Sequence, residues 1–318
     1  KIVNKPLVFV PEPIAEEGIE KLETFCSVSA PWRDNKPAGE IPIEAEAIMV
    51  RIFPLDHKRI TEATNLRVIA KHGVGFDNID VHHAYTKGIP VVWTPNANAE
   101  SVSQHAIALM LGLTYKLIQS DKGLRNGNFE HRMSWSSMEL EGRTLGILGL
   151  GRIGRRTAKK AINGFAMNVI AYDPYIDQAT SINSVKLLPR LETLLEQCDF
   201  LSLHIPLTEE THDIINSERI SIIKQGCHLI NTSRGETVDL NAVSQALNSG
   251  HLAGAAIDVF PQEPPNLYQP IFQASNTLLT PHIAGLSDRA IVQVATEAAD
   301  GIIDVLQGKK PQNEVSII

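Results

Sequence analysis

Three side chains of complementary chemistry follow strand-like runs in the second half of the chain. They are Arg234 after residues 227–233, Glu263 after residues 253–260, and His282 after residues 276–280. A guanidinium group can hold a carboxylate and polarise a carbonyl, and an imidazole beside a carboxylate can transfer a proton. Because ligands bind at the carboxyl ends of strands in open α/β sheets, we expect the three to share one rim. Taken singly, the arginine could be a surface ion pair, the glutamate a solvated loop acid and the histidine a residue leading into a helix.

A glycine-rich turn predicts a nucleotide site on the same sheet. The apolar run 145–150 leads into Gly149, Gly151 and Gly154, which form a G-x-G-x-x-G pattern before a helical stretch. In this pattern the first glycine permits a tight turn, the second lets the backbone approach a pyrophosphate, and the third lets helix and strand pack closely. The phosphates would bind the N–H groups at the helix start. The alternative is a βα turn that holds no ligand.

An acidic residue indicates which dinucleotide is bound. Asp173 ends the next strand-like run, residues 168–173, about 20 residues past Gly154, where a carboxylate can accept hydrogen bonds from an adenosine ribose. A carboxylate there would repel a 2′-phosphate, so the sequence favours NAD over NADP.

A second glycine-rich loop lies in the first half of the chain. Gly73 and Gly75 directly follow the strand-like run 67–72. A loop of this kind at a strand's carboxyl end offers N–H groups to an anion, and a substrate carboxylate would fit. An ordinary turn, with Asp77 and Asn78 as turn residues, is an equally good explanation.

Alternating strands and helices must position these residues, and they predict an α/β protein with parallel sheets. The expected strands are residues 7–10, 26–29, 45–50, 67–72, 89–93, 145–150, 168–173, 200–205, 227–233, 253–260 and 276–280. The expected helices include residues 13–25, 60–63, 101–117, 191–197, 216–223, 239–248 and 288–307. Residues 30–40 are expected to be loop, and residues 123–137 a polar, irregular, exposed arm. The apolar 101–117 helix is predicted to be buried between domains or subunits.

Composition narrows the class of protein. The 318 residues suffice for two domains, and 43% hydrophobic and 20% charged residues are typical of a soluble globular chain. The net charge of −7 argues against nucleic acid or an anionic membrane as the main partner. Three scattered cysteines (Cys26, Cys198, Cys227) indicate a reducing, cytoplasmic location and neither a metal site nor a disulfide. Nothing resembles a transmembrane span.

These motifs together resemble the D-isomer-specific 2-hydroxyacid dehydrogenase family, and most of all its phosphoglycerate dehydrogenases. The resemblance covers nearly the whole chain and includes residues 67–80, 145–158, 203–208, 231–236, 256–264 and 279–285. It implies two Rossmann-like, doubly wound parallel-sheet lobes with an intervening cleft. The substrate-binding lobe would comprise residues 1–98 and 287–318, and the NAD-binding lobe residues 99–286. It also implies a homodimer, formed through the nucleotide lobe.

The resemblance also assigns residues to roles. The catalytic arginine, glutamate and histidine of the family match Arg234, Glu263 and His282. The nucleotide contacts match Arg152, Ile153, Asp173, Ile205, Thr232, Asp258 and residues 282–285, including Gly285. Val74 matches a position near substrate and nicotinamide, whereas His72, His105 and His204 are interpreted as structural or supporting residues.

The charges of these side chains suggest a mechanism. Hydride delivery to C2 of a 2-oxo acid builds negative charge on its oxygen, which Arg234 would stabilise while holding the carboxylate. Protonated His282 would donate a proton to the forming hydroxyl and act as base in the reverse direction. Glu263 would orient His282 and favour its charged form. The backbone from Gly73 to Gly75 would complete the carboxylate site.

The identity of the substrate is a more open question. Arg51 and Arg132 resemble phosphate-contacting arginines of phosphoglycerate dehydrogenases, the second supplied across a dimer, although each could be a solvated surface arginine. If both act, the substrate carries a second anionic group. Because the sequence ends at Ile318, we expect no C-terminal regulatory domain like that of long phosphoglycerate dehydrogenases. Alternatives are a glyoxylate/hydroxypyruvate reductase of the same family or an NAD(H)-sensing, corepressor-like binding protein. Formate dehydrogenases share the fold but lack the Glu–His pairing.

Overall fold

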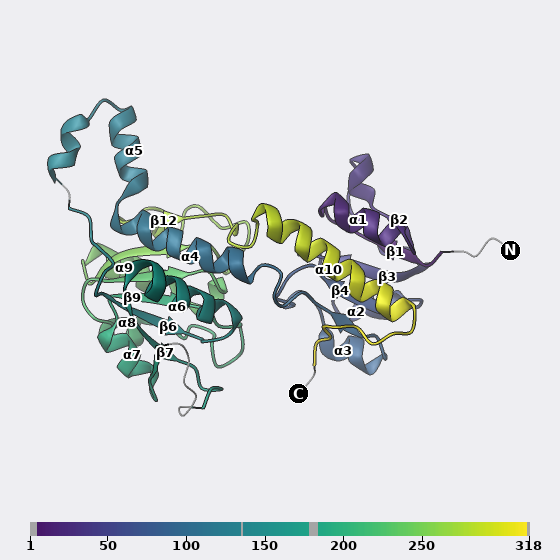
Figure 1. Cartoon of the computed structure of the whole chain (residues 1–318). Coiled ribbons are helices and arrows are strands. Elements are labelled where there is room, and N and C mark those ends of the chain that lie inside the picture. The colour runs from purple at the N-terminus through teal and green to yellow at the C-terminus, as the bar shows by residue number, and fades with distance from the viewer. Residues whose placement is uncertain (1–4, 135, 178–183, 317–318) are drawn as a thin grey trace. The chain divides into compact units, whose positions relative to one another are not determined.

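Two compact α/β units make up the computed structural model, which describes residues 5–134, 136–177 and 184–316 (Figure 1). The first unit comprises Lys1–Ala99 and Gly285–Ile318, and the second Glu100–Ala284. Each unit has its own parallel sheet with helices on both faces, which confirms the predicted fold class. The assignment of one unit to the substrate and the other to the nucleotide remains a prediction.

The second unit is built on a seven-stranded sheet in which every strand pair is parallel. The order is β12-β11-β10-β9-β6-β7-β8. The strands are β6 (Thr144–Leu148), β7 (Asn168–Tyr172), β8 (Lys186–Leu187), β9 (Phe200–Leu203), β10 (Cys227–Asn231), β11 (Leu252–Ile257) and β12 (Thr277–Leu279). The chain starts at β6, proceeds to β8, and then crosses to the other side at β9. The neighbouring strands β6 and β9 therefore mark a topological switch point, where open α/β sheets bind ligands.

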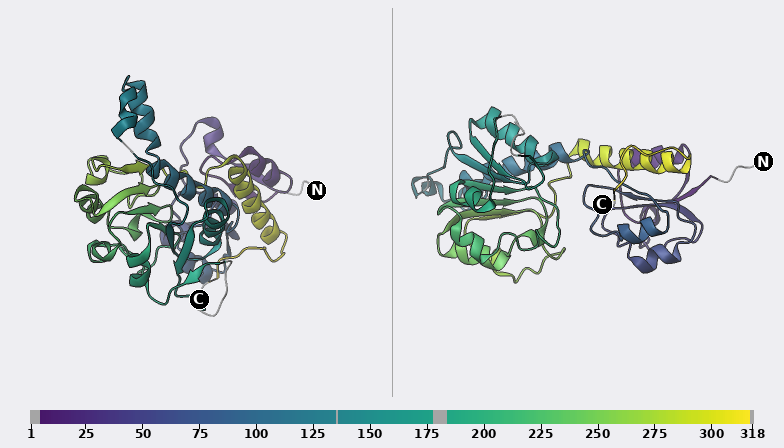
Figure 2. Two further views of the ribbon diagram at one scale, coloured as in Figure 1. Left: turned by 60° about the vertical axis from the view of Figure 1, so that its left-hand side comes forward. Right: turned by 90° about the horizontal axis from the view of Figure 1, so that it is seen from below.

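Helices cover both faces of the sheet of the second unit (Figure 2), and two apolar layers hold them against it. One face is covered by α4 (Ala99–Thr114) and α6 (Arg152–Phe165). The other face is covered by α7 (Leu191–Gln197), α8 (Ser217–Ile222) and α9 (Leu240–Asn248). Because both faces are buried, the strands are nearly continuous apolar runs, which is why they were readable in the sequence.

The first unit has a five-stranded parallel sheet in the order β2-β1-β3-β4-β5. Its strands are β1 (Leu7–Phe9), β2 (Ser27–Ser29), β3 (Ala45–Val50), β4 (Val68–Lys71) and β5 (Val91–Val92). Helices α1 (Glu16–Glu23) and α10 (Asp288–Leu306) cover one face, and α2 (His57–Glu62) and α3 (Val81–Thr86) cover the other. The switch point lies between β1 and β3, so the segments after these strands are where a ligand is expected.

The arm after α4 differs from the predicted irregular segment. Residues Leu117–Arg125 form helix α5 and Phe129–Ser134 a 3-10 helix, η2, whereas Trp135 lies outside the described residues. An ion pair between Arg125 and Asp121, 2.9 Å apart and four residues apart in sequence, supports α5. The polar composition of residues 123–137 therefore correctly predicts an exposed arm but wrongly predicts an irregular one.

Other boundaries also differ from the predictions. The predicted 101–117 helix ends at Thr114, because Lys116 adopts a left-handed φ of 49°. The predicted loop 30–40 contains a 3-10 turn, η1 (Pro31–Asp34). The six-residue helix α3 and the two-residue strand β8 were not predicted.

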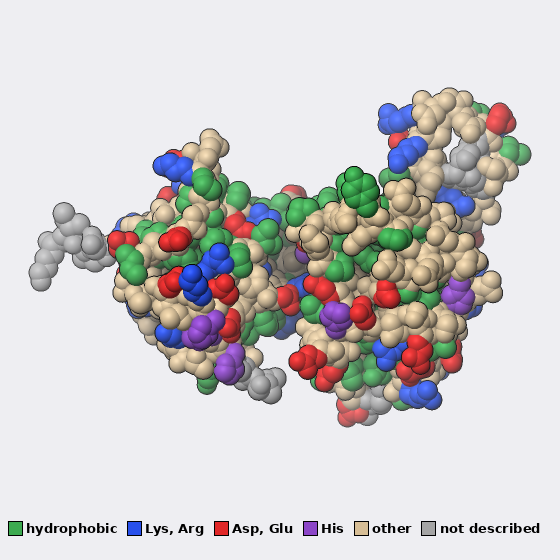
Figure 3. Space-filling view, turned by 180° about the vertical axis from the view of Figure 1, so that it is seen from behind, with side chains coloured by type: hydrophobic (Ala, Val, Ile, Leu, Met, Phe, Trp, Pro, Cys, Tyr) green, Lys and Arg blue, Asp and Glu red, His purple; other side chains and the backbone are tan. Residues whose placement is uncertain are grey.

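The surface carries charges of both signs. Figure 3 shows acidic and basic side chains dispersed over one face of the two units, as the modest negative net charge leads one to expect. Each helix within the described ranges is too short or too polar to cross a membrane.

Candidate active site

The glycine-rich turn after β6 is a tight junction of strand and helix. Gly149 has a left-handed φ of 91°, and a Cβ there would lie 2.5 Å from the carbonyl oxygen of His204. A Cβ on Gly154 would lie 2.2 Å from the carbonyl oxygen of Gly149. Neither position accepts a side chain without movement of the backbone. The second glycine, Gly151, faces open space, as an approaching ligand requires.

The start of α6 fits a dinucleotide pyrophosphate. The helix is 14 residues long, and its N-cap Gly151 makes no side-chain cap. Amides in the first turn of a helix have no partner within the helix itself, so the start of α6, Arg152 and Ile153, suits phosphate oxygens. Ile205, after β9, packs on the turn, because a Cβ on Gly149 would lie 2.7 Å from its Cγ2 atom.

Asp173 is fixed to this turn by hydrogen bonds. Its Oδ2 atom accepts from the backbone N–H of Leu150 at 2.9 Å, and its Oδ1 atom from that of Tyr175 at 3.0 Å. Each carboxylate oxygen can accept more than one hydrogen bond, so both can also accept from a ribose. The carboxylate therefore has a set position at the end of β7, beside the start of α6.

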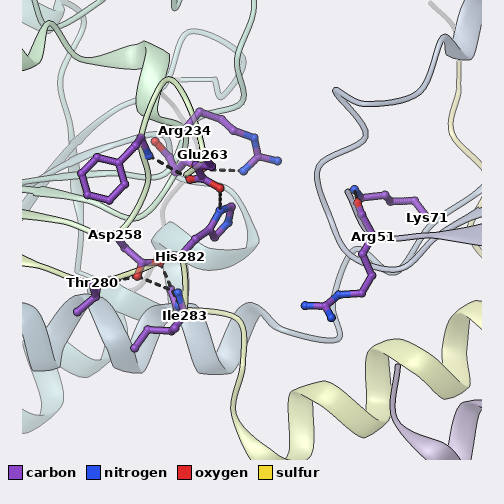
Figure 4. Close-up of polar contacts among 11 residues, drawn as sticks. Arg51, Lys71, Arg234, Asp258, Glu263, Thr280, His282 and Ile283 are labelled. Carbon is purple, nitrogen blue, oxygen red and sulfur yellow. Dashed lines mark hydrogen bonds and ion pairs between the residues drawn. The ribbon is translucent and has the colours of Figure 1, made fainter. Parts of the chain in front are cut away.

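Arg234, Glu263 and His282 follow three adjacent strands, β10, β11 and β12, and lie at one edge of the sheet (Figure 4). Glu263 Oε2 lies 2.7 Å from His282 Nδ1, and Glu263 Oε1 accepts from the backbone N–H of Phe260 at 3.1 Å. Burial raises the pKa of Glu263, but the hydrogen bonds from His282 and Phe260 outweigh it and hold the pKa below its usual value. Glu263 is therefore ionised at neutral pH and orients the imidazole through Nδ1.

The loop that carries Arg234 is organised by Asn231, a fully buried residue of β10. Asn231 Oδ1 accepts from Ser233 N at 3.0 Å, and Asn231 Nδ2 donates to Arg234 O at 2.8 Å. The Arg234 side chain donates from Nη1 to Ser233 O at 2.7 Å. In the same loop, Thr232 has a buried hydroxyl for which no partner exists among the residues described. A ligand that accepts or donates a hydrogen bond fits there, as expected for a nucleotide contact.

Asp258 holds the backbone around His282. The Asp258 side chain is 0% exposed; Oδ1 accepts from Thr280 Oγ1 at 2.6 Å and from Ile283 N at 2.9 Å, and Oδ2 from Ala284 N at 3.0 Å. His282 has a left-handed φ of 54°, which is unfavourable for most residues other than glycine. The carboxylate thus stabilises the strained turn that presents the imidazole (Figure 4).

His105, on α4, completes this network. Its Nε2 atom lies 3.5 Å from Asp258 Oδ1 and 3.2 Å from Thr280 Oγ1. Burial raises the pKa of Asp258, but the hydrogen bonds from His105, Thr280 and the two loop amides lower it overall. Sequence reasoning had assigned Asp258 to the nucleotide and had not linked it to these partners. The sequence motif around Asp258 and Glu263 does not reveal this contact, because the turn at residues 282–284 lies more than 20 residues after Asp258 in the chain.

Buried histidines elsewhere are unsuited to proton donation at neutral pH. Burial lowers the pKa of His204 to about 4. Burial, together with the charges of Arg51 and Lys71, lowers the pKa of His72 to about 3. Both histidines are therefore neutral at neutral pH, whereas His282 is half-exposed and contacts the Glu263 carboxylate.

The first unit holds the remaining candidates, described by themselves. Gly73 follows β4 with φ 138°, and its N–H donates to Thr94 Oγ1 at 3.2 Å. Among the described residues, the backbone amides of Val74 and Gly75 donate no backbone hydrogen bond. The 73–75 loop therefore offers two amides, not three, to an anion. Gly285 begins the returning segment of this unit, and a Cβ there would lie 2.9 Å from Asn98 Nδ2.

The two candidate tail-binding arginines have different surroundings. Arg51 follows β3; its backbone N–H donates to Glu12 Oε2 at 2.7 Å and its Nη1 to Pro13 O at 2.9 Å. Arg132 lies on η2 of the arm, with its guanidinium 4.5 Å from the centre of the Phe129 ring. The structure thus fixes Arg51 at the switch point of the first unit and places Arg132 on an exposed arm.

Comparison with known proteins decides the family. Residues 107–284 match the family model described as "D-isomer specific 2-hydroxyacid dehydrogenase, NAD binding domain". The chain belongs to this family. The predicted family is confirmed, and the protein is an oxidoreductase that acts on CH–OH groups with a nicotinamide dinucleotide.

Individual relatives show how similar the chain is to known members. The glyoxylate reductase of Korarchaeum cryptofilum is 36% identical over 322 residues, which cover 98% of this chain and 96% of that protein. The D-3-phosphoglycerate dehydrogenase of Archaeoglobus fulgidus is 36% identical over 314 residues, 98% of this chain and 59% of that protein. The crystal structure of D-lactate dehydrogenase from Aquifex aeolicus, complexed with NAD and lactic acid, has a TM-score of 0.85 and 30% identity, covering 97% of this chain and 98% of that one. Their names specify different acids, so the comparisons establish the reaction class and not the acid.

Proposed function

We propose that this dehydrogenase interconverts a D-2-hydroxy acid and its 2-oxo acid with Arg234, Glu263 and His282 as the catalytic residues. The observation that carries the proposal is the 2.7 Å contact between Glu263 Oε2 and His282 Nδ1. These two residues follow β11 and β12, and β11 adjoins β10, the strand that precedes Arg234. A carboxylate on Nδ1 leaves Nε2 as the nitrogen that faces the substrate.

Each residue has a separate task in the reduction. When bound, the reduced nicotinamide supplies the hydride to C2 of the 2-oxo acid. The planar fork of Arg234 holds the carboxylate and stabilises the negative charge that grows on the C2 oxygen. His282, protonated, donates its Nε2 proton to that oxygen and takes it back in the oxidation. Ionised Glu263 stabilises the imidazolium and sets the ring orientation.

The preferred cofactor is NAD rather than NADP. The supporting observation is that both oxygens of Asp173 are fixed by backbone amides at the end of β7. A carboxylate in that position accepts hydrogen bonds from the ribose hydroxyls and repels a 2′-phosphate.

The substrate carries a second anionic group, as in the phosphoglycerate dehydrogenases. Arg51 supports this, because its backbone is fixed by Glu12 and its guanidinium by Pro13 at the switch point of the first unit. Arg132 would assist from the partner of a dimer. A glyoxylate or hydroxypyruvate reductase is the second candidate. In its favour, the side chain next to Arg51, Ile52, is apolar and 80% exposed, which suits a small substrate without a tail.

A panel of 2-oxo acids tests the function and separates these candidates. Initial rates with NADH and NADPH would be compared for 3-phosphohydroxypyruvate, hydroxypyruvate, glyoxylate and pyruvate. A preference for the phosphorylated acid supports the anionic tail, and no preference refutes it. If no acid is reduced although NADH binds tightly, the protein is instead an NAD(H)-sensing binding protein of the same fold.

The protein acts as a homodimer formed through the second unit. The arm supports this, because several apolar side chains on it are exposed to solvent: Leu117, Leu124, Phe129 and Met133. Light scattering after gel filtration gives the mass directly. Leu124→Asp combined with Phe129→Asp should shift a dimer to monomer, whereas Tyr268→Asp, at an exposed aromatic outside the arm, should leave it unchanged. A monomeric wild type at micromolar concentration contradicts the proposal.

A further inference from the structure

A buried lysine connects the two candidate substrate segments of the first unit. Lys71 is the last residue of β4 and is only 7% exposed. Its ammonium group donates to the backbone carbonyl of Arg51 and, at 2.7 Å, to Asn78 Oδ1. Figure 4 shows Lys71 reaching the main chain at Arg51. The segments after β3 and β4 are therefore joined through one cation.

Neighbouring contacts make this connection rigid. Asn78 Nδ2 donates to Phe53 O at 2.8 Å, and the N–H of Leu55 donates to Asn78 O at 2.8 Å. On the other side, the carboxylate of Glu12 accepts from the consecutive amides of residues 51–53 at 2.7 to 3.1 Å. Lys71 and Asn78 flank the 73–75 loop in sequence, so the two segments are held as one structure.

The lysine lies against the loop that offers amides to an anion. A Cβ built on Gly73 would lie 3.6 Å from Lys71 Cε, so the aliphatic part of the side chain runs beside the start of the loop. The next two amides, of Val74 and Gly75, are the proposed carboxylate donors. The field of Lys71 also extends to the residue that precedes Gly73, since Lys71 and Arg51 both contribute to the lowered pKa of His72.

A charge at this position is not needed to fill the space. Burying an ammonium group costs free energy, and an unbranched apolar side chain of similar length can fill such a site without that cost. A cation buried beside the start of a loop that offers amides strengthens the binding of an anion to that loop.

We propose that Lys71 is a positioning and specificity-determining residue: its ammonium group fixes the 73–75 loop to the Arg51 segment and favours a substrate that presents a carboxylate to this loop. The proposal rests on the proposed binding of the substrate carboxylate by the amides of Val74 and Gly75. It assigns to the first unit a cation that selects 2-oxo acids over their uncharged analogues.

The test compares an anionic and a neutral inhibitor. Oxamate and oxamide have the same size, but only oxamate presents a carboxylate. In Lys71→Met, we expect the inhibition constant of oxamate with the NADH complex to rise about tenfold, because one charge near the anion is lost. The constant for oxamide should change less than twofold, and so should the dissociation constant of NADH, which is bound by the second unit. If Lys71 has only a structural role, Lys71→Met should weaken the binding of both inhibitors equally, and that result would overturn the proposal.

Controls separate this proposal from the proposed function. Lys58→Met removes an exposed lysine of the same unit, whose side chain is 79% exposed, and should leave both constants unchanged. If wild type reduces no 2-oxo acid, the proposed function fails; if it does and Lys71→Met binds oxamate normally, only the Lys71 assignment fails. Should Lys71→Met not fold, Asn78→Asp puts a counter-charge on Lys71 and should weaken oxamate more than oxamide. Equal effects on both inhibitors in that variant contradict the assignment.

Discussion

The backbone of Gly235 packs directly against the backbone of Phe260. A Cβ at Gly235 would lie 2.0 Å from the carbonyl carbon of Phe260 and 2.3 Å from the nitrogen of Pro261. Gly235 follows Arg234, and the Phe260–Pro261 peptide leads to Glu263. This contact therefore sets the spacing between the loop that carries the arginine and the loop that carries the glutamate.

Replacing this glycine should separate the two loops. In Gly235→Ala the methyl group meets backbone atoms, which cannot move without displacing Arg234 or Glu263. We expect a loss of about 2 kcal/mol in the free energy of unfolding and a fall in kcat/KM of about tenfold to a hundredfold, because small misplacements of catalytic groups are costly. Urea denaturation and steady-state rates measure both.

Gly164 provides the matched control. It lies in α6, and nothing is within 4 Å of a Cβ built there. Gly164→Ala should leave activity unchanged and leave stability equal or slightly higher, because alanine is the better helix former. If Gly235→Ala behaves like Gly164→Ala, the contact does not set the loop spacing.

Removing the imidazole tests the assignment of His282. We expect His282→Ala to lower kcat by about 10² to 10⁴, the usual contribution of a general acid–base residue, while NADH binding, measured by fluorescence, persists. His282→Asn is the more exact variant, since asparagine tolerates the left-handed backbone at this position. His212→Ala, at an exposed histidine of the same unit, is the control. Unchanged turnover in both His282 variants excludes the residue from catalysis.

Much of the fold was predictable because both sheets are buried on both faces. Apolar runs marked β3, β6 and β10, and glycine or polar residues marked their carboxyl ends. Since parallel strands end at one edge, the residues that follow β10, β11 and β12 were expected to share a rim. The structure brings Glu263 and His282 into hydrogen-bond contact there.

The contacts that support those residues were not predictable from the pattern. Asn231 and Asp258 lie within apolar runs, and nothing in their spacing shows which backbone amides they bind. The Gly235–Phe260 contact depends on how closely two loops approach, which no periodicity reports. The two-residue strand β8 and the helical structure of the arm around Arg132 were also not predicted. The composition of these segments indicates exposure to solvent but not secondary structure.

Charge alone should not preserve the function of Arg234. In Arg234→Lys the positive charge remains, but one ammonium group cannot make the paired, planar contacts of a guanidinium. We expect kcat/KM for 2-oxo acids to fall by about a hundredfold, with NADH affinity retained. Arg219→Lys is the matched control, because Arg219 Nη1 donates to the Ile214 carbonyl and has no role in the proposed site. Near-normal kcat/KM in Arg234→Lys contradicts the assigned role.

The charge of Asp173 should govern the choice of dinucleotide. Asp173→Asn keeps an oxygen that can accept from Leu150 N, but removes the negative charge. We expect the ratio of kcat/KM for NADPH to that for NADH to rise about tenfold, as the repulsion of the 2′-phosphate is lost. Asp177→Asn, a few residues further along the chain, should leave the ratio near the wild-type value. An unchanged ratio in Asp173→Asn shows that another residue discriminates.

Buried histidines should make the protein less stable as the pH falls from 6.5 towards 4. Burial lowers the pKa of His72 to about 3 and those of His204 and His228 to about 4, from an ordinary value of 6.5. In this range the unfolded chain binds protons at these histidines that the folded chain does not. Stability is therefore complete above pH 6.5 and decreases below it, by roughly 1 kcal/mol per histidine for each pH unit.

One substitution isolates a single histidine in this pH dependence. His228 stacks on Phe200 with ring centres 5.1 Å apart, and its buried Nδ1 has no hydrogen-bond partner within the described ranges. His228→Phe keeps the stacking and removes one titrating group, so the slope of unfolding free energy against pH between 6 and 5 should fall by roughly 1 kcal/mol per pH unit. His212→Asn, at an exposed histidine, should leave the slope unchanged. Equal slopes for wild type and His228→Phe would show that His228 is not held neutral in the folded protein, because a histidine protonated equally in both states contributes nothing to the slope.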